Sequence, residues 1–227
     1  MKVLVLSSGG IDSTTCLALA VHKYRAENVI SLSVFYNQKH EKELEAARKI
    51  AKHYNVVHKE LNLGAVFADS DCTLLSGRDD IAHQDYAKQI KERNGKPVTT
   101  YVPFRNGLFL SCAASIALAN DCTEIYYGAH ADDSAGNAYP DTSKAFNDAM
   151  SNAVYEGSGK QVKIVAPFIN MTKADVVKKG IELGVKYEQT WSCYEGGEKP
   201  CGKCATCIDR IKAFEQNKIK DPAEYEV

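Results

Sequence analysis

The first 24 residues contain the pattern that most restricts the folds open to this chain. A short β-branched apolar run, residues 2–6, leads into a loop with two adjacent glycines, and helically spaced apolar residues follow from Asp12 to Tyr24. An apolar run that ends at turn residues predicts a buried parallel strand. A strand, a glycine loop and a helix in this order predict the opening unit of an α/β fold.

The rest of the chain continues to alternate between strand and helix patterns. Further strands are predicted at 28–35, 56–61, 124–129 and 162–166, and helices at 41–54, 108–119 and 172–183. The last helix has a capping box of Thr172 and Asp175 at its start and Gly184 at its end. This alternation predicts a Rossmann-like parallel sheet of five strands between two layers of helices.

Two segments depart from the alternation. Residues 64–100 are polar and weakly periodic, and we expect a long excursion there with a short helix near 84–91. Composition also changes near Trp191, where a cluster of cysteines begins. We therefore predict an α/β domain of residues 1–190 that binds the nucleotide, with a small C-terminal lobe of residues 191–227 packed on it.

Charge and hydropathy exclude some functions. The chain has 28 basic and 29 acidic residues, whereas proteins that bind nucleic acids or anionic membrane surfaces usually have a basic excess. The N-terminal apolar run is too short for a signal peptide, and no stretch approaches the roughly 20 apolar residues that cross a bilayer. We expect a cytoplasmic protein that binds neither membranes nor nucleic acid directly.

The glycine loop is the predicted nucleotide site. It joins a strand to a helix, which is where open α/β sheets bind phosphates, and glycine lets an anion approach the backbone closely. The free N–H groups and the dipole of the next helix favour negative charge. The predicted ATP-binding residues are Ser8, Gly9, Gly10, Ile11, Asp12, Ser13 and Thr14.

Asp12 distinguishes this loop from other phosphate-binding loops. A carboxylate beside phosphates predicts a bridging Mg²⁺, which prefers hard oxygen ligands. The loop lacks the lysine of a Walker A sequence. The order Ser-Gly-Gly-x-Asp-Ser after an N-terminal strand resembles the pyrophosphate loop of the N-type ATP pyrophosphatases. That resemblance implies cleavage of ATP to AMP and pyrophosphate, to adenylate a second substrate.

Four cysteines near the C-terminus form a predicted metal site. Cys193, Cys201, Cys204 and Cys207 lie within 15 residues, with the two-residue gaps typical of ligands around a tetrahedral ion. Four thiolates fill the coordination shell of one Zn²⁺, so the site should be structural. An iron–sulfur cluster and a redox-active or persulfide-carrying Cys-x-x-Cys remain open as alternatives.

Three more segments lie where predicted strands end or helices begin. They are 35–40 (Phe-Tyr-Asn-Gln-Lys-His), 99–106 (Thr-Thr-Tyr-Val-Pro-Phe-Arg-Asn) and 127–141. Ligands of parallel sheets bind at that edge. With the glycine loop and the cysteine cluster, in this order over nearly the whole chain, these segments resemble the 7-cyano-7-deazaguanine synthase family of queuosine biosynthesis. Phe104 is a departure, since some relatives have glycine there.

The resemblance implies an ATP-dependent ligase that forms carbon–nitrogen bonds. It implies 7-carboxy-7-deazaguanine as the substrate and ammonium as the nitrogen donor. ATP first adenylates the carboxylate, and ammonia displaces AMP to give an amide. A second ATP then activates the amide oxygen, and elimination gives the nitrile. The resemblance also implies a homodimer.

Residue chemistry suggests candidates in these segments. A carboxylate can accept the ring N–H and amino donors of a deazaguanine together, an arginine can hold a carboxylate or phosphate, an aromatic ring can stack on a base, and a histidine can move a proton. Each candidate also has a plainer explanation, such as a solvated acid or a structural histidine. The predicted substrate-binding residues are Tyr36, Arg105, Asn106, His130, Asp132, Asp133 and Asp141, and the predicted catalytic residues are Asp12, Arg105 and Asp132.

Two other functions are weighed against this one. A tRNA-modifying enzyme with the same loop, for thiolation or lysidine formation, would need a basic face and, for thiolation, free catalytic cysteines. A nucleotide-binding or zinc-stapled interaction protein without catalysis would bind ATP and not turn it over. The neutral charge counts against the first, and Asp12 with the middle segments counts against the second.

Overall fold

Five parallel strands form one sheet in a computed structural model that describes residues 1–226. The strand order is β3-β2-β1-β4-β5. In chain order the strands are β1 (Lys2–Leu6), β2 (Val29–Phe35), β3 (Val57–Asn62), β4 (Cys122–Tyr126) and β5 (Lys163–Val165). The predicted α/β class with a five-stranded parallel sheet is confirmed.

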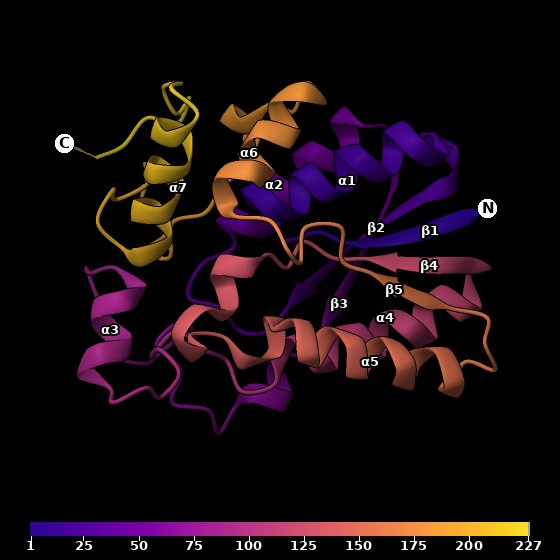
Figure 1. Ribbon diagram of the computed structural model, residues 1–227, viewed down its shortest axis with the longest axis horizontal. Coiled ribbons are helices and arrows are strands. Elements are labelled where there is room, and N and C mark those ends of the chain that lie inside the picture. The colour runs from indigo at the N-terminus through magenta and orange to yellow at the C-terminus, as the bar shows by residue number, and fades with distance from the viewer. Residues whose placement is uncertain (227) are drawn as a thin grey trace.

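Helices cover both faces of this sheet (Figure 1). One face carries α1 (Ile11–Tyr24), α2 (Lys42–His53) and α6 (Lys173–Glu182), with α7 (Ala205–Gln216) packed on α6. The other carries α4 (Arg105–Ala119) and α5 (Lys144–Gly157). Because side chains alternate across a strand, Val3 and Val5 pack in the core under α1 and α6, whereas Leu4 packs in the core under α4 and α5. All three side chains are 0% exposed, as expected for a central strand.

Two predicted boundaries and one helix that was not predicted are the differences from the structure that bear most on the site and the fold. Helix α4 begins at Arg105 rather than at residue 108, so its first turn contains two predicted site residues. Strand β4 ends at Tyr126, and residues 127–129 belong to the loop beyond it. Helix α5 was not predicted, since its apolar stripe is narrow and interrupted by asparagine, serine and aspartate.

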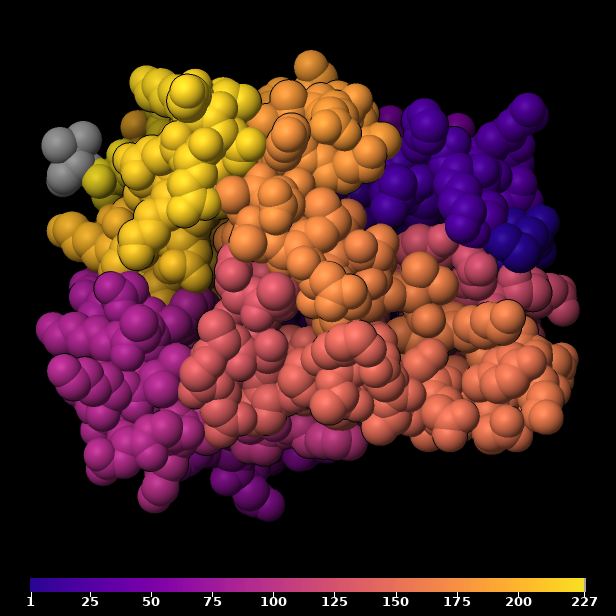
Figure 2. Space-filling view, in the orientation of Figure 1, coloured from indigo at the N-terminus to yellow at the C-terminus, as the bar shows by residue number. Residues whose placement is uncertain are grey.

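The excursion and the C-terminal segment lie against one another (Figure 2). Within the excursion, α3 (Tyr86–Glu92) is the expected short helix. His83 Nε2 lies 2.7 Å from the Glu195 carboxylate, and the Tyr86 and Tyr194 hydroxyls are 2.9 Å apart. Residues far apart in the sequence therefore meet at the edge of the sheet where the strands end.

The C-terminal segment also has a polar core of its own. Arg210 of α7 donates from Nε and Nη2 to both oxygens of Asp221, at 2.8 and 2.9 Å. Further Arg210 donors reach Thr190 Oγ1 and the Tyr187 carbonyl. This cluster fixes α7 to the chain before and after it. No helix within residues 1–226 has the length and apolar character to cross a bilayer.

Candidate active site

The glycine loop lies between β1 and α1 and leans directly on α2. Gly9 has a φ of +85°, and a Cβ there would come within 2.3 Å of the Glu43 carbonyl oxygen, so only glycine fits. The Trp191 N–H donates to the Gly9 carbonyl oxygen at 2.9 Å. Gly10 caps α1 without a side-chain bond, and the first N–H groups of the helix therefore stay available for an anion.

Loop hydroxyls add to these donors. Ser8 and Ser13 have their Oγ atoms 3.1 Å apart, and Ser13 Oγ also lies 3.1 Å from the Ser8 nitrogen. The Thr14 Oγ1 atom is buried without a hydrogen-bond partner among the described residues. A loop with free N–H groups at a helix start and two serine hydroxyls that line the pocket fits the phosphates of a nucleotide.

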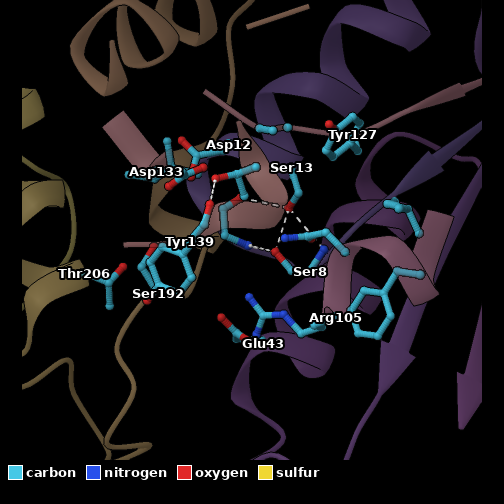
Figure 3. A pocket seen from close by; sticks show the side chains of 18 of the residues that line it. Ser8, Asp12, Ser13, Glu43, Arg105, Tyr127, Asp133, Tyr139, Ser192 and Thr206 are labelled. Atoms are coloured by element: carbon cyan, nitrogen blue, oxygen red, sulfur yellow. Dashed lines mark hydrogen bonds between the residues drawn. The ribbon is translucent and has the colours of Figure 1, made fainter. Parts of the chain in front are cut away.

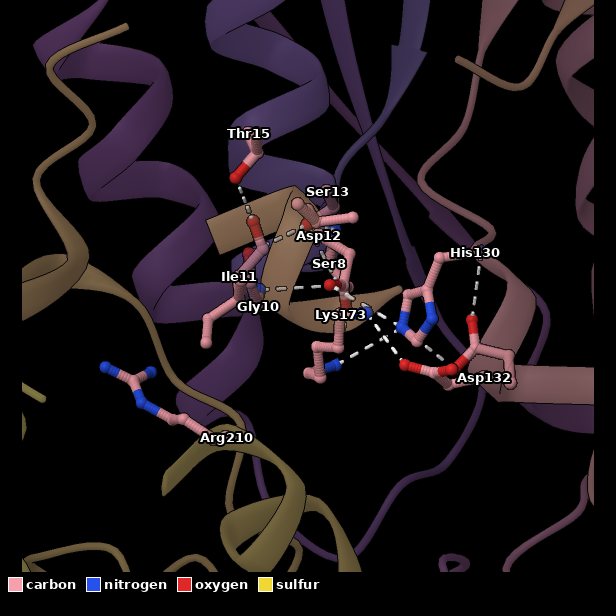
Figure 4. A network of polar contacts seen from close by, with 12 residues as sticks. Ser8, Gly10, Ile11, Asp12, Ser13, Thr15, His130, Asp132, Lys173 and Arg210 are labelled. Carbon is pink, nitrogen blue, oxygen red and sulfur yellow. Dashed lines mark hydrogen bonds and ion pairs between the residues drawn. The ribbon is translucent and has the colours of Figure 1, made fainter. Parts of the chain in front are cut away.

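Asp12 is paired with a lysine that the sequence analysis did not single out. Lys173, the first residue of α6, places Nζ 2.8 Å from Asp12 Oδ2 (Figure 4). Burial alone would raise the pKa of Asp12, but Lys173 and His130 outweigh burial and hold that pKa below its ordinary value. Asp12 Oδ1 has no hydrogen-bond partner within residues 1–226.

His130 links this pair to Asp133. Its side chain is 2% exposed, and Nε2 lies 3.7 Å from Asp12 Oδ1 and 3.2 Å from Asp133 Oδ1. Burial would lower the pKa of His130, yet the two carboxylates raise it above the ordinary value. Three of the predicted site residues therefore form one charged network with Lys173.

The other two predicted acids, Asp132 and Asp141, accept backbone N–H groups at the starts of two helices. Asp132 is exposed, and Oδ2 accepts the backbone N–H of Lys173 at 2.8 Å. Asp141 is 3% exposed, and Oδ2 accepts the N–H of Asn106 at 2.8 Å. Neither carboxylate lines the pocket. Their observed contacts position α6 and α4, and their predicted roles toward the substrate stay predictions.

Arg105 enters the pocket from the first turn of α4. The residue before it, Phe104, has a φ of 54°, in the left-handed region, and turns the chain into the helix. The Arg105 guanidinium donates to the Tyr36 hydroxyl at 3.0 Å and lies 5.1 Å from the centre of the Tyr36 ring. Tyr36 is thus held against Arg105 at the wall of the pocket, and its contact with a substrate stays a prediction.

A single cavity joins these groups (Figure 3). Its apolar wall comes from strand ends and α4, with Leu6, Leu32, Val34 and Phe109. Of the predicted residues, those that line it are Ser8, Gly10, Ile11, Asp12, Ser13, Tyr36, Arg105, Asn106 and Asp133, whereas Gly9, Thr14, His130, Asp132 and Asp141 do not. The phosphate loop and the Arg105 segment therefore line one pocket.

Sequence analysis missed several residues that line this pocket. Besides Lys173 they include Glu43 at the start of α2, Thr206 and Asp209 on α7, and three tyrosines. Lys173 had a usable signal, because it is the first helical residue after the last strand and so lies at the ligand-binding edge. The residues of α7 had none, since no pattern predicted that helix.

The three tyrosines close one side of the pocket. The hydroxyl of Tyr139 lies 3.3 Å from that of Tyr86 and 3.2 Å from that of Tyr194, and Thr100 Oγ1 lies 2.7 Å from the Tyr139 oxygen. Burial is the first cause that raises the pKa of each phenol, so all three stay protonated. The excursion, the loop after β4 and the C-terminal segment each supply one ring.

The four predicted metal ligands do come together. The Sγ atoms of Cys193, Cys201, Cys204 and Cys207 all lie within 4.8 Å of one another, and all four residues are buried. Backbone N–H groups donate to two of these sulfurs at 3.3 to 3.4 Å, as thiolate ligands require. No cysteine sulfur lines the pocket. The cluster suits a metal ion with a structural role.

The sequence of this chain is similar to one protein family and to several of its members. Residues 2–218 match the protein family described as queuosine biosynthesis protein QueC. A 7-cyano-7-deazaguanine synthase of Archaeoglobus fulgidus is 41% identical over 223 residues, covering 98% of this chain and 89% of that protein. The synthase of Caldicellulosiruptor bescii is 39% identical over 227 residues, covering 100% of this chain and 98% of that protein.

Solved structures support the fold alone. The chain resembles the U34-tRNA thiolase NcsA of Methanococcus maripaludis with its [4Fe-4S] cluster, at a TM-score of 0.51 and 17% identity over 96% of this chain and 67% of that one. It also resembles NMN synthetase of Francisella tularensis, at a TM-score of 0.54 and 13% identity over 96% of this chain and 78% of that one. Family membership rests on the family match and the sequence relatives: the chain belongs to the QueC family of queuosine biosynthesis.

Proposed function

We propose that this chain converts 7-carboxy-7-deazaguanine and ammonium to 7-cyano-7-deazaguanine at the expense of ATP, as the names of its relatives suggest. The observation that carries the proposal is the single cavity that joins the phosphate loop to Arg105. Adenylation requires an acid and the α-phosphate of ATP in one enclosed space, with charges to hold both. A pocket of this kind supplies that proximity.

The residues divide the work by their positions. The loop N–H groups and the Ser8 and Ser13 hydroxyls hold the phosphates. The substrate carboxylate oxygen attacks the α-phosphorus, and the bond to pyrophosphate breaks. Lys173, 13% exposed and at the mouth of the loop, neutralises the charge that develops on the leaving pyrophosphate. Ammonia then attacks the carbonyl carbon, and AMP leaves.

The second activation uses the same groups. The amide oxygen attacks the α-phosphorus of a second ATP, pyrophosphate leaves, and the nitrogen loses one proton. Loss of AMP together with the remaining N–H proton then gives the nitrile. Arg105 is placed to stabilise negative charge on the oxygen in both rounds, because it lines the same pocket as the phosphate loop. Neither round needs a side-chain nucleophile.

Metal ions complete the proposal. We assign Mg²⁺ to the phosphates with Asp12 as its protein ligand, since Asp12 Oδ1 is buried without a partner in the described chain. We assign one structural Zn²⁺ to the four cysteines, whose geometry and donor atoms fit it. Ammonium as donor, a homodimer and a cytoplasmic location stay predictions from the sequence.

A single reaction tests the proposal. The protein is incubated with Mg-ATP, ammonium and 7-carboxy-7-deazaguanine, and AMP, pyrophosphate and the nitrile are measured by mass spectrometry. We expect all three products. A folded, zinc-loaded protein that makes no nitrile would refute the activity, and ADP in place of AMP would refute the adenylation mechanism.

Two lysines of α6 provide a matched pair of variants. Lys173→Met should lower AMP formation by about 10²- to 10³-fold, as expected for loss of one charge at the reacting centre. Lys179→Met changes an exposed lysine on the same helix, 39% exposed, and should leave the rate unchanged. Equal rates for the two variants would remove Lys173 from the mechanism.

The runner-up, a tRNA-modifying enzyme, gains little from the site. Its cysteines would have to reach the substrate, but the four clustered sulfurs do not line the pocket. A tRNA association that weakens with added salt, together with transfer of sulfur or lysine to tRNA, would favour it instead.

A further inference from the structure

Glu43 is an acid in the pocket without a partner. It lies in the first turn of α2, its side chain lines the cavity, and the residue is half-buried. No hydrogen bond or ion pair joins its carboxylate to another group in residues 1–226, in contrast to Asp12, Asp133 and Asp141, whose partners are described above. A partly buried acid that lacks a partner is costly unless a ligand provides one.

Glu43 faces a guanidinium across the cavity. Figure 3 shows the Glu43 carboxylate and the Arg105 guanidinium pointing toward one another beneath Ser8. The positive charge of Arg105 lowers the pKa of Glu43, yet the two groups form no ion pair within 4.0 Å. Arg105 instead donates to Tyr36. Because both side chains line the cavity and do not pair with each other, a ligand in the cavity that offers a donor and an acceptor can bind both.

The charge state of Glu43 agrees with this arrangement. Burial is the first cause that raises its pKa, to about 7, and the positive charge of Arg105 only partly opposes burial. In the ligand-free pocket the ionised form of Glu43 is therefore only weakly favoured near neutral pH. A ligand with N–H donors would favour the ionised form, because a carboxylate accepts two such bonds at once.

We propose that Glu43 accepts the ring N–H and the 2-amino group of the deazaguanine, and so selects the substrate. This inference rests on the proposed function, which supplies the substrate. The opposite polarity of Arg105 suits the carbonyl or carboxylate oxygens of the same molecule. Glu43 thus takes the role for which sequence analysis offered Asp132, Asp133 and Asp141.

The competing ligand for an acid of this kind is ammonium, which also donates N–H groups. Steady-state kinetics separate the two, because each predicts a different Michaelis constant to change. A further probe is 7-carboxy-7-deazahypoxanthine, which keeps the ring N–H and lacks the 2-amino group. A site built to accept that amino group discriminates against a molecule that lacks it.

The test compares Glu43→Gln with Glu45→Gln, a matched change of an exposed acid in the first turn of the same helix. Glutamine has nearly the same shape but places an N–H donor where one acceptor stood. We expect Glu43→Gln to raise the KM for 7-carboxy-7-deazaguanine by about 10- to 100-fold. Its preference for that acid over the deazahypoxanthine acid should fall by a similar factor, with the KM for ammonium unchanged. Glu45→Gln should match the wild type in all three.

Each other outcome overturns the assignment. An unchanged preference between the two acids in Glu43→Gln refutes recognition of the amino group, and a raised KM for ammonium alone assigns Glu43 to ammonium instead. A lowered kcat with the same preference would make Glu43 a residue that only positions others. Failure of the wild type to form nitrile refutes the proposed function and this inference together, whereas nitrile formation with unchanged preference refutes Glu43 only. Thermal unfolding of both variants excludes a folding defect.

Discussion

Two arginine–carboxylate pairs with the same bonding pattern allow the effect of burial on stability to be isolated. Arg210 donates from Nε and Nη2 to both oxygens of Asp221, at 2.8 and 2.9 Å. Arg48 on α2 donates in the same manner to both oxygens of Glu60, at 2.6 and 2.8 Å. The side chains of the first pair are 2% and 6% exposed, and those of the second are 44% and 38% exposed.

The perturbation is Arg→Met at each position, which keeps an unbranched side chain and removes the charge. Arg210→Met leaves Asp221 buried without its partner, and such a loss costs about 3 to 5 kcal/mol. Arg48→Met leaves Glu60 in water, and an exposed pair of this kind contributes at most about 1 kcal/mol. The predicted difference between the two variants is therefore at least about 2 kcal/mol.

Urea unfolding at pH 7, at a fixed free zinc concentration and monitored by far-UV circular dichroism, measures that difference. Zinc content per chain is determined for both variants, so that metal loss is not mistaken for loss of the ion pair. The reasoning is refuted if the two variants lose the same free energy of unfolding within about 0.5 kcal/mol. It is also refuted if the Arg48 variant loses more.

Acid provides a second check on the same pair. Burial would raise the pKa of Asp221, but Arg210 outweighs burial and lowers that pKa below its ordinary value. A depressed pKa stabilises the fold above the unfolded value, and this contribution is lost as pH falls through the folded value. The gap between wild type and Arg210→Met should therefore narrow below about pH 4.

Three further outcomes are expected. Elemental analysis should find one zinc per chain, lost together with stability in Cys204→Ser and retained in Cys16→Ser, which changes a buried cysteine outside the cluster; metal retained in the first variant would contradict a four-thiolate site. The pKa of His130 is raised above 6.5, so the stability that its charge contributes is complete below that pH and is lost as pH rises through the folded pKa. Urea midpoints measured from about pH 6 to 8 should therefore fall more in the wild type than in His130→Gln. Parallel curves for the two proteins would contradict a charged His130 that stabilises the fold. Gly180→Ala would place a Cβ 1.8 Å from the Tyr187 hydroxyl oxygen and should lower the free energy of unfolding by about 1 to 3 kcal/mol. Adding Tyr187→Phe removes that oxygen and should recover part of the loss. No recovery would mean that the clash is not with that hydroxyl.

Strand β1 shows why much of the fold could be predicted from the sequence. Both faces of β1 are buried at Val3, Leu4 and Val5, so these residues had to be apolar, and the glycines after the strand mark its end. The capping box of Thr172 and Asp175 was equally local and is confirmed. Helix α5 shows the limit, because its packing depends on the apolar stripe of Phe146, Met150 and Val154, and the residues between them form helices poorly.

The site was harder to predict because its charges pair over long distances in the sequence. Asp12 indicated a nearby cation, and the sequence analysis proposed Mg²⁺. In the structure the ammonium group of Lys173 pairs with the Asp12 carboxylate. No local pattern connects those two positions. Glu43 was hidden for another reason. Acids are common in the first turn of a helix, where they favour the dipole, so an acid that lines a pocket looks no different from one that faces water.

Strand β1 pairs with β2 on one edge and with β4 on the other, so Val3 lies opposite both Val29 and Glu124. At synthesis rates of about 5 to 20 residues per second, residues near 191 follow Gly9 by roughly 10 to 40 s. Until then the loop lacks the Trp191 N–H that bonds to the Gly9 carbonyl oxygen. Strand β4, which covers the second edge of β1, begins only at Cys122. A growing chain therefore carries a central apolar strand with one open edge for several seconds, and such an edge can pair with other chains. We expect early β1 segments to depend on chaperones, and nucleotide binding to begin only when the last part of the chain has left the ribosome.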